Sequence, residues 1–430
     1  MRYYSLNKQS KDVDFRTATI QGQAPDKGLY FPAELPKLSP SFIAALPDLD
    51  REELAYEVMK PYVGENIPAN ELYSIIKETI DFPFPLVQLN ETYYSLELFH
   101  GPTLAFKDVG ARFMSRCLGY FSKDRQSKTT VLVATSGDTG GAVANGFLGV
   151  EGVEVVILYP SGKVSNVQEL QLTTCGQNIT ALEVQGSFDD CQAMVKEAFM
   201  DSTLQTSLSL TSANSINVAR WLPQQLYYFF ALQQWEDKYT PPVIAVPSGN
   251  FGNICAGLLA RYSGLPVNKF IAACNINDTV TPYLETGVFR PKAAIQTISN
   301  AMDVGNPSNL SRIIELFKQE GIAIQDIVQT ACVTDAATMT CMVDVYKDYG
   351  YTLDPHGAVA FAALQKFLKP GEKGIFLETA HPVKFPDTVT RAIGKSPEQP
   401  AAIEPLFTKE KKSIPMHASF HALKEWLMDR

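Results

Sequence analysis

Lys107 is the side chain best placed for covalent chemistry, in the segment His-Gly-Pro-Thr-Leu-Ala-Phe-Lys-Asp at residues 100–108. The residues before it are apolar, and residues 109–114 have the pattern of a helix start. The positive end of a helix dipole and partial desolvation both lower the pKa of an amine. A neutral amine is the form that condenses with an aldehyde. Taken alone, a lysine beside an aspartate is more typical of a solvated helix face, so the interpretation depends on the rest of the chain.

Two loops that contain glycine each follow a predicted strand and begin a predicted helix. The first is Thr-Ser-Gly-Asp-Thr-Gly-Gly at 135–141, after a strand at 129–134; the second is Pro-Ser-Gly-Asn-Phe-Gly-Asn at 247–253, after a strand at 243–246. Backbone N–H groups at such helix starts bind anions. Neither loop has the Walker sequence or the dinucleotide fingerprint. Each loop alone is more typical of a tight turn, but the two loops together with Lys107 predict an active site that binds an anion.

The elements that position these residues divide the chain into two parts. Residues 1–95 predict a separate, mainly helical piece, with helices near 39–46 and 51–59 and a proline-rich break at 81–85. Residues 96–430 alternate strand, small-residue loop and helix. This alternation predicts an α/β region with buried parallel strands and ligand loops at their carboxyl ends.

Composition excludes several classes of protein. A chain of 430 residues predicts two or three domains, and its 45% hydrophobic content is that of an ordinary globular protein. The net charge of −9 argues against nucleic acid or an anionic membrane as partner. The first residues contain no apolar segment, so we expect no secretory signal, and no apolar run has membrane-spanning length. The seven cysteines are scattered without a Cys-x-x-Cys pair, so we expect no zinc or other metal site, no disulfides, and a cytoplasmic location.

Four motifs occur in one order along the chain. They are His-Gly-Pro-Thr-x-x-Phe-Lys-Asp, Thr-Ser-Gly-Asp-Thr-Gly, Asn-Ser-Ile-Asn with a following arginine, and Pro-Ser-Gly-Asn-Phe-Gly-Asn. In these motifs the chain resembles the threonine synthase family of fold-type II pyridoxal-phosphate enzymes, in the branch with a distinct N-terminal domain. The resemblance extends over essentially the whole chain. It implies a tryptophan synthase β-like fold with two α/β domains, the cofactor between them, and the N-terminal domain at residues 1–95.

The resemblance implies that Lys107 holds pyridoxal 5'-phosphate covalently. The second loop looks like a cup for the cofactor phosphate, and Thr379 looks like the partner of the pyridine nitrogen. A hydroxyl there makes the ring a weaker electron sink than a carboxylate would, which suits elimination and replacement. Taken alone, a threonine that ends a strand is usually a cap or turn residue. The implied cofactor-binding residues are Lys107, Asp138, Ser248, Gly249, Asn250, Phe251, Gly252, Asn253 and Thr379.

The first loop looks like a clamp for the α-carboxylate of the substrate, and Arg220 with its neighbours looks like a site for a substrate phosphate. Arginine offers phosphate a rigid bidentate fork. Taken alone, Asn-Ser-Ile-Asn at 214–217 is an ordinary helix-capping sequence. The implied substrate-binding residues are Ser136, Gly137, Thr139, Lys163, Asn214, Ser215, Asn217 and Arg220.

The reaction that the resemblance implies converts O-phospho-L-homoserine and water into L-threonine and phosphate, by γ-elimination and β-addition of water. A phospholyase acting on the same substrate and a serine or threonine dehydratase are alternatives of the same fold. The N-terminal domain and the cluster at 214–220 favour the synthase over the dehydratases. The alternative of a non-catalytic α/β ligand-binding protein would account for the glycine loops but would give Lys107 no functional role. The sequence leaves both a monomer and a homodimer open.

Overall fold

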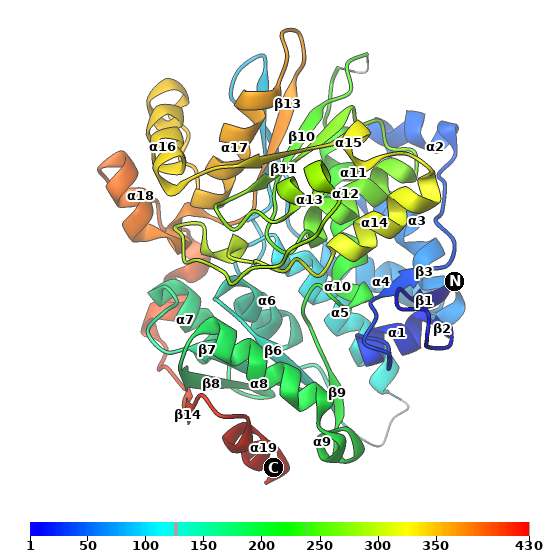
Figure 1. The fold of residues 1–430 in the computed structure, drawn as a ribbon, viewed down its shortest axis with the longest axis vertical. Coiled ribbons are helices and arrows are strands. Elements are labelled where there is room, and N and C mark those ends of the chain that lie inside the picture. Colours follow the sequence, from blue (N-terminus) through cyan, green and yellow to red (C-terminus); the bar gives the residue numbers. More distant parts are fainter. Residues whose placement is uncertain (124–127, 238, 430) are drawn as a thin grey trace.

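Two parallel β-sheets lie one above the other along the long axis of the molecule, with a small N-terminal sheet at their side (Figure 1). The computed structural model describes residues 1–123, 128–237 and 239–429. The predicted α/β class is confirmed. No helix in the described part of the chain has both the length and the apolar character needed to cross a membrane.

The larger sheet has six strands in the order β12-β11-β10-β13-β5-β4, parallel except for the pair β4 and β5. Helix α17 covers one face and α12 lies against the other. Burial on both faces accounts for the apolar strands at the centre. The strands are β4 (Leu86–Gln88), β5 (Tyr93–Glu97), β10 (Val243–Pro247), β11 (Lys269–Cys274), β12 (Val328–Cys332) and β13 (Gly374–Glu378). The helices of this half are α11 (Leu226–Gln233), α12 (Gly252–Tyr262), α13 (Val280–Thr286), α14 (Leu310–Glu320), α15 (Ile324–Ile327), α16 (Asp335–Tyr349), α17 (Pro355–Phe367) and α18 (Pro386–Ile393).

The smaller sheet has five parallel strands in the order β14-β8-β7-β6-β9. Side chains of β6 and β7 alternate between two hydrophobic clusters, one shared with α5 and α6 and the other with α8 and α19. The strands are β6 (Thr129–Ala134), β7 (Val153–Pro160), β8 (Ile179–Gln185), β9 (Ser209–Thr211) and β14 (Ile414–His417). The helices are α5 (Lys107–Ser122), α6 (Asp138–Phe147), α7 (Asn166–Thr173), α8 (Phe188–Met200), α9 (Ser202–Ser207) and α19 (Phe420–Met428).

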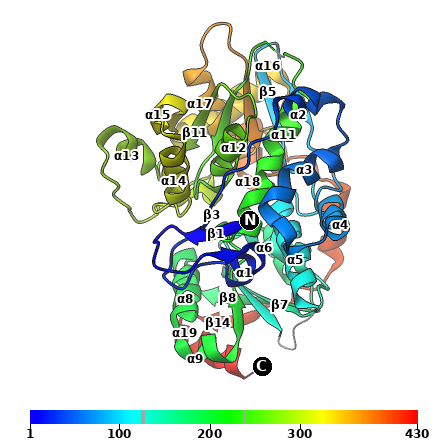
Figure 2. The same ribbon diagram turned by 90° about the vertical axis from the view of Figure 1, so that its right-hand side faces the viewer.

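The N-terminal part has the expected helices and, in addition, a small β-sheet. The expected helices near 39–46 and 51–59 are present as α2 (Pro40–Ala45) and α3 (Arg51–Val63), but a three-stranded antiparallel sheet precedes them (Figure 2). The other elements are β1 (Arg2–Ser5), β2 (Val13–Asp14), α1 (Phe15–Gln21), β3 (Tyr30–Pro32) and α4 (Ala69–Thr79). Strands β4 and β5 belong to the larger sheet, so a boundary at residue 95 falls inside β5. Their pairing favours a boundary at the proline-rich break, residues 81–85.

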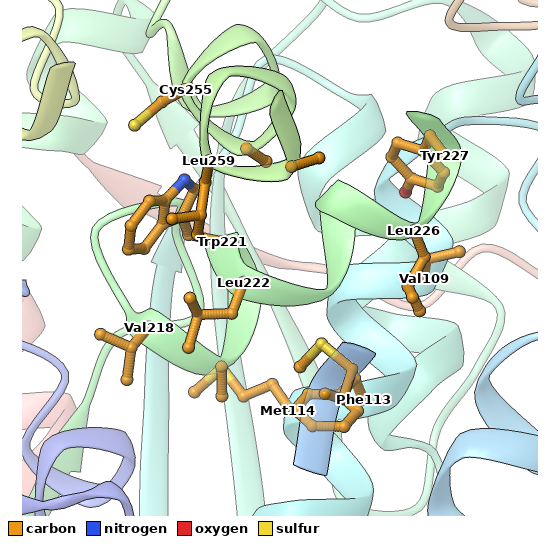
Figure 3. Close-up of a cluster of buried hydrophobic side chains, with 14 of the residues drawn as sticks. Val109, Phe113, Met114, Val218, Trp221, Leu222, Leu226, Tyr227, Cys255 and Leu259 are labelled. Carbon is orange, nitrogen blue, oxygen red and sulfur yellow. The ribbon is translucent and has the colours of Figure 1, made fainter. Parts of the chain in front are cut away.

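A buried apolar cluster fixes the first turns of α5 against α10 (Val218–Trp221), and α10 in turn contacts α12. Figure 3 shows Phe113 and Met114 of α5 on the side of Val218 and Leu222, while Trp221 faces α12. The contact is close, because a Cβ on Gly110 would lie 2.6 Å from the carbonyl oxygen of Arg220. This packing sets the distance between the start of α5, which carries Lys107, and the helix that carries Arg220.

Candidate active site

A cavity of about 1120 Å³ opens at the loops that follow β6, β10 and β13. Parallel sheets place ligands at the carboxyl ends of their strands, and both sheets contribute here. Most of the predicted site residues line this cavity: Lys107, Ser136, Asp138, Thr139, Asn214, Ser215, Arg220, Gly249, Asn250, Phe251, Gly252, Asn253 and Thr379. Its described lining does not include Gly137, Lys163, Asn217 or Ser248.

Lys107 is the first residue of α5, as the sequence predicts, and its side chain is 15% exposed. Its Nζ lies 3.6 Å from Oδ2 of Asp138. Burial lowers the pKa of Lys107; Asp138 opposes this shift, while the positive charges of Lys384 and Arg220 add to it. The segment before Lys107 is tied to the end of β13, because Phe106 N–H donates to the carbonyl of Thr379 at 2.8 Å. The two predicted cofactor contacts, Lys107 and Thr379, are therefore held together.

Asp138 is the first residue of α6 and is buried. Its Oδ1 accepts from Nζ of Lys384 at 2.8 Å and from Nε2 of Gln168 at 3.0 Å. Burial alone would raise the pKa of this carboxyl, but the ammonium group of Lys384, and Lys107 whenever it is protonated, hold it well below its usual range. Asp138 is therefore a carboxylate in the folded protein.

The sequence analysis missed Gln168 and Lys384, which hold Asp138 in place from outside the described lining of the cavity. Gln168 carries a local signal only as part of a capping box with Ser165, at the start of α7. Gly137, whose φ is 133°, fits tightly against it, since a Cβ there would lie 2.5 Å from the Gln168 side chain. Gly137 therefore shapes the first loop and does not line the cavity.

The second loop turns into α12 through Phe251, which has a left-handed backbone (φ 61°). The first N–H groups of α12 have no acceptor within the helix, and Nδ2 of Asn253 is buried without a hydrogen-bond partner among the described residues. Asn250 is held by its own contact from Nδ2 to Oγ of Ser215, at 2.6 Å. This set of open donors at a helix start fits the dianionic phosphate of pyridoxal phosphate.

Ser248 does not belong to that set of donors. Its hydroxyl donates to the carbonyl of Val246 at 2.8 Å, and its N–H donates to the carbonyl of Ala273 at 2.8 Å. The residue is buried and its donors are occupied within the sheet. Ser248 thus supports the loop, and its contact with the cofactor stays a prediction.

Arg220 lies on α10 and is only 4% exposed. Its Nε and Nη1 are buried and have no hydrogen-bond partner in the described part of the chain, and neither has Oδ1 of Asn214. Burial lowers the pKa of Arg220 to about 10, so the guanidinium stays charged at neutral pH. A buried unpaired cation is costly, and an anion in the cavity would remove that cost. Gln224, another cavity residue absent from the predictions, lies one turn further along the chain with its Oε1 unpaired among these residues.

Two of the substrate contacts expected from the sequence, Asn217 and Lys163, lie outside the described lining of the cavity. Asn217 is fully buried: its Oδ1 accepts from Ala219 N–H, and its Nδ2 donates to the carbonyls of Thr19 and Ser212. This is the capping role that its local sequence also favours. Lys163 is exposed in the loop after β7. Hydrogen bonds with Ser187 lower the pKa of Asp190 at the start of α8, and the positive charge of Lys163 adds to this shift.

Replacing Asn217 with alanine should therefore destabilise the fold without changing the substrate site. Loss of the cap and of the two bonds to carbonyls should lower the free energy of unfolding by about 1–3 kcal/mol. Urea unfolding measures this, and the KM of the variant should equal that of the parent. Asn214→Ala, which changes a cavity residue on the same segment, is the matched variant and should raise KM instead.

Comparison with known proteins agrees with the architecture and the cavity. Family models described as "Threonine synthase N terminus", "Pyridoxal-phosphate dependent enzyme" and "Threonine synthase, C-terminal" match residues 2–80, 79–377 and 357–427. Threonine synthase of Escherichia coli (strain K12) is 43% identical over 430 residues, covering 100% of both chains. The enzyme of Serratia marcescens is 42% identical and covers 100% of this chain and 99% of its own.

Solved structures give the same result. The crystal structure of threonine synthase from Escherichia coli matches with a TM-score of 0.94 over 100% of both chains. A structure of threonine synthase with bound PLP, from Brucella melitensis, matches with a TM-score of 0.93 at 35% identity, over 100% of this chain and 99% of the other. With a full-length match and a cavity whose lysine and helix start suit the cofactor, this chain belongs to the threonine synthase family of pyridoxal-phosphate-dependent enzymes.

Proposed function

We propose that this site converts O-phospho-L-homoserine and water into L-threonine and phosphate. The observation that carries the proposal is the buried guanidinium of Arg220, which has two unpaired donors and faces the same cavity as Lys107. The start of α12 supplies a first anion site for the cofactor phosphate. Arg220 supplies a second, which a substrate with its own phosphate group requires. A dehydratase of the same fold has no phosphate to place there.

The cofactor would be held by residues of three segments. Lys107 would bind its aldehyde, the first turn of α12 its phosphate, and Thr379 its pyridine nitrogen, since all three line the cavity. Bound pyridoxal phosphate supplies a ring that takes up the electron pair left when a proton is removed from the substrate's α-carbon. Asp138, as a carboxylate whose Oδ2 lies 3.6 Å from Nζ of Lys107, would be close to the bound cofactor.

The side chains of this chain divide the remaining tasks. Lys107, as a neutral amine, can take the proton from the α-carbon and deliver it to a neighbouring carbon. Ser136 and Thr139 lie in a loop that is folded around Oγ1 of Thr135, which accepts from the N–H groups of Gly137 at 3.0 Å and Gly140 at 2.8 Å. That loop would hold the α-carboxylate. Arg220 would bind the γ-phosphate and stabilise the charge that grows on it as it leaves.

The substrate is thus a small anionic amino acid.

All seven cysteines are free, and Cys332 is exposed. Free thiols of this kind persist in a reducing compartment, which supports the cytoplasm as the place of the reaction.

One assay tests the proposal. The purified protein, loaded with pyridoxal phosphate, is incubated with O-phospho-L-homoserine, and phosphate, threonine and 2-oxobutyrate are measured together. We expect threonine and phosphate in equal amounts and negligible 2-oxobutyrate. Phosphate with 2-oxobutyrate would identify a phospholyase. Conversion of threonine to 2-oxobutyrate or of serine to pyruvate, without release of phosphate from O-phospho-L-homoserine, would identify a dehydratase. The absence of all these products would favour a binding protein.

A further inference from the structure

Lys384 is a lysine with no exposed surface, deep beside the proposed active site. It ends the short 3-10 helix η5 (Pro382–Lys384), six residues after β13. Its Nζ lies 2.8 Å from Oδ1 of Asp138 and donates to the carbonyl of Thr103 at 2.9 Å. A fully buried lysine is rare unless it is paired, and the position of this one is set by groups from two other segments.

Lys384, Asp138 and Lys107 form a row with the carboxylate in the middle. Lys384 and Gln168 both donate to Oδ1 of Asp138, so this oxygen is occupied. The other oxygen, Oδ2, is the one that faces the Lys107 amine at 3.6 Å. The orientation of the carboxylate toward Lys107 is therefore determined by Lys384 and Gln168.

The charges in this row act against one another. A lone carboxylate 3.6 Å from an amine stabilises the ammonium form, in which the amine can neither condense with an aldehyde nor take up a proton. The charged groups that face Lys107 are Asp138 from α6, Lys384 from η5 and Arg220 from α10. Asp108, the next residue on α5, is turned away and accepts from Thr103 N–H at 2.9 Å. The pKa of Lys107 remains below its usual value, because burial and the two cations outweigh Asp138.

We propose that Lys384 is a positioning residue of this active site: it neutralises and orients Asp138, so that Lys107 remains a neutral amine. The proposal rests on the assignment of Lys107 in the proposed function. The pair Asp138–Lys384 is neutral as a whole but keeps an acceptor oxygen directed at the amine. Neither residue alone does both.

The test measures Lys107 itself, without turnover. Cofactor-free, full-length protein is mixed with pyridoxal phosphate at a series of pH values. The neutral amine adds to the aldehyde with loss of one water, and borohydride then reduces the C=N bond to a stable amine. Mass spectrometry of the peptide that contains Lys107 gives the rate of attachment. The midpoint of the pH dependence of this rate reports the pKa of the Lys107 amine.

Lys384→Met should move this midpoint upward by about one to three pH units, because Asp138 is then unopposed. Each unit means about tenfold slower attachment at a fixed pH below the midpoint. Asp138→Asn, which leaves the cation of Lys384 unopposed, should move the midpoint downward. The double variant Asp138→Asn with Lys384→Met removes both charges and should return the midpoint close to that of the parent.

Lys373→Met is the matched control. Lys373 forms an ion pair with Asp237 at 2.9 Å on the surface, away from the cavity, so its loss should leave the midpoint unchanged. If Lys384→Met kept the parent's midpoint, or if the double variant shifted as far as the single one, Lys384 would have only a structural role. If Lys384→Met did not fold, the double variant would decide: a parental midpoint supports the proposal, and a shifted one or a second failure to fold overturns it. Attachment at another lysine would instead refute the assignment of Lys107.

Discussion

Lys107→Ala should abolish turnover while the protein still folds. The substitution removes the amine that holds the cofactor and the base that takes the α-proton, so we expect kcat to fall on the order of 10⁴-fold or more. The side chain is at the first position of α5 and lines the cavity, so its loss leaves the apolar residues of that helix in place. Phosphate release from O-phospho-L-homoserine measures the loss, and thermal unfolding measures the fold.

The control for this variant is another lysine of the same chain. Lys163→Ala changes an exposed side chain after β7 and should leave both kcat and KM unchanged. Borohydride treatment of the parent protein should fix pyridoxal phosphate on the peptide that contains Lys107. A label on Lys384 or Lys163, or a Lys107→Ala protein that still turns over, would show that the reactive amine is elsewhere.

The parts of the site that could be predicted from the sequence are those determined by local structure. Lys107 begins α5, and the two glycine loops begin α6 and α12, because a strand, a tight turn and a helix start each have a signal within a few residues. The strands expected at 129–134 and 243–246 are β6 and β10 for the same reason. Local signals also placed the helices α2 and α3.

Tertiary contacts, which leave no local sequence signal, place the residues that the sequence analysis missed next to Asp138. Lys384 reaches Asp138 across 246 positions of the chain, and no periodicity or capping pattern marks it. Gln168 resembles any other residue of a capping box. The strands of the N-terminal sheet have only two to four residues, too few for an alternating pattern to be recognised. Asn217 is a different case, because a capping side chain and a substrate contact have the same sequence pattern, and the structure shows it as a cap.

Removing the guanidinium of Arg220 should weaken the binding of the phosphorylated substrate far more than the binding of the cofactor. Arg220→Met keeps the length and apolar packing of the side chain but loses the charge-assisted hydrogen bonds to the γ-phosphate. Such buried contacts to a charged group are worth about 2–5 kcal/mol, so kcat/KM for O-phospho-L-homoserine should fall by about 30- to 4000-fold. Cofactor content and the absorption spectrum should not change, because the cofactor phosphate binds at the start of α12 in this assignment.

Inorganic phosphate offers a second measurement that does not depend on turnover. It should compete with the substrate at Arg220 in the parent protein and do so more weakly in Arg220→Met. Arg220→Lys keeps the charge but not the planar fork, so phosphate should compete in this variant more weakly than in the parent and more strongly than in Arg220→Met. If Arg220→Met lost bound cofactor in proportion to its activity, Arg220 would serve the cofactor or the fold, and the division of the cavity into two phosphate sites would be wrong. Unchanged competition by phosphate would lead to the same conclusion, because two unpaired buried donors are the reason for placing an anion there.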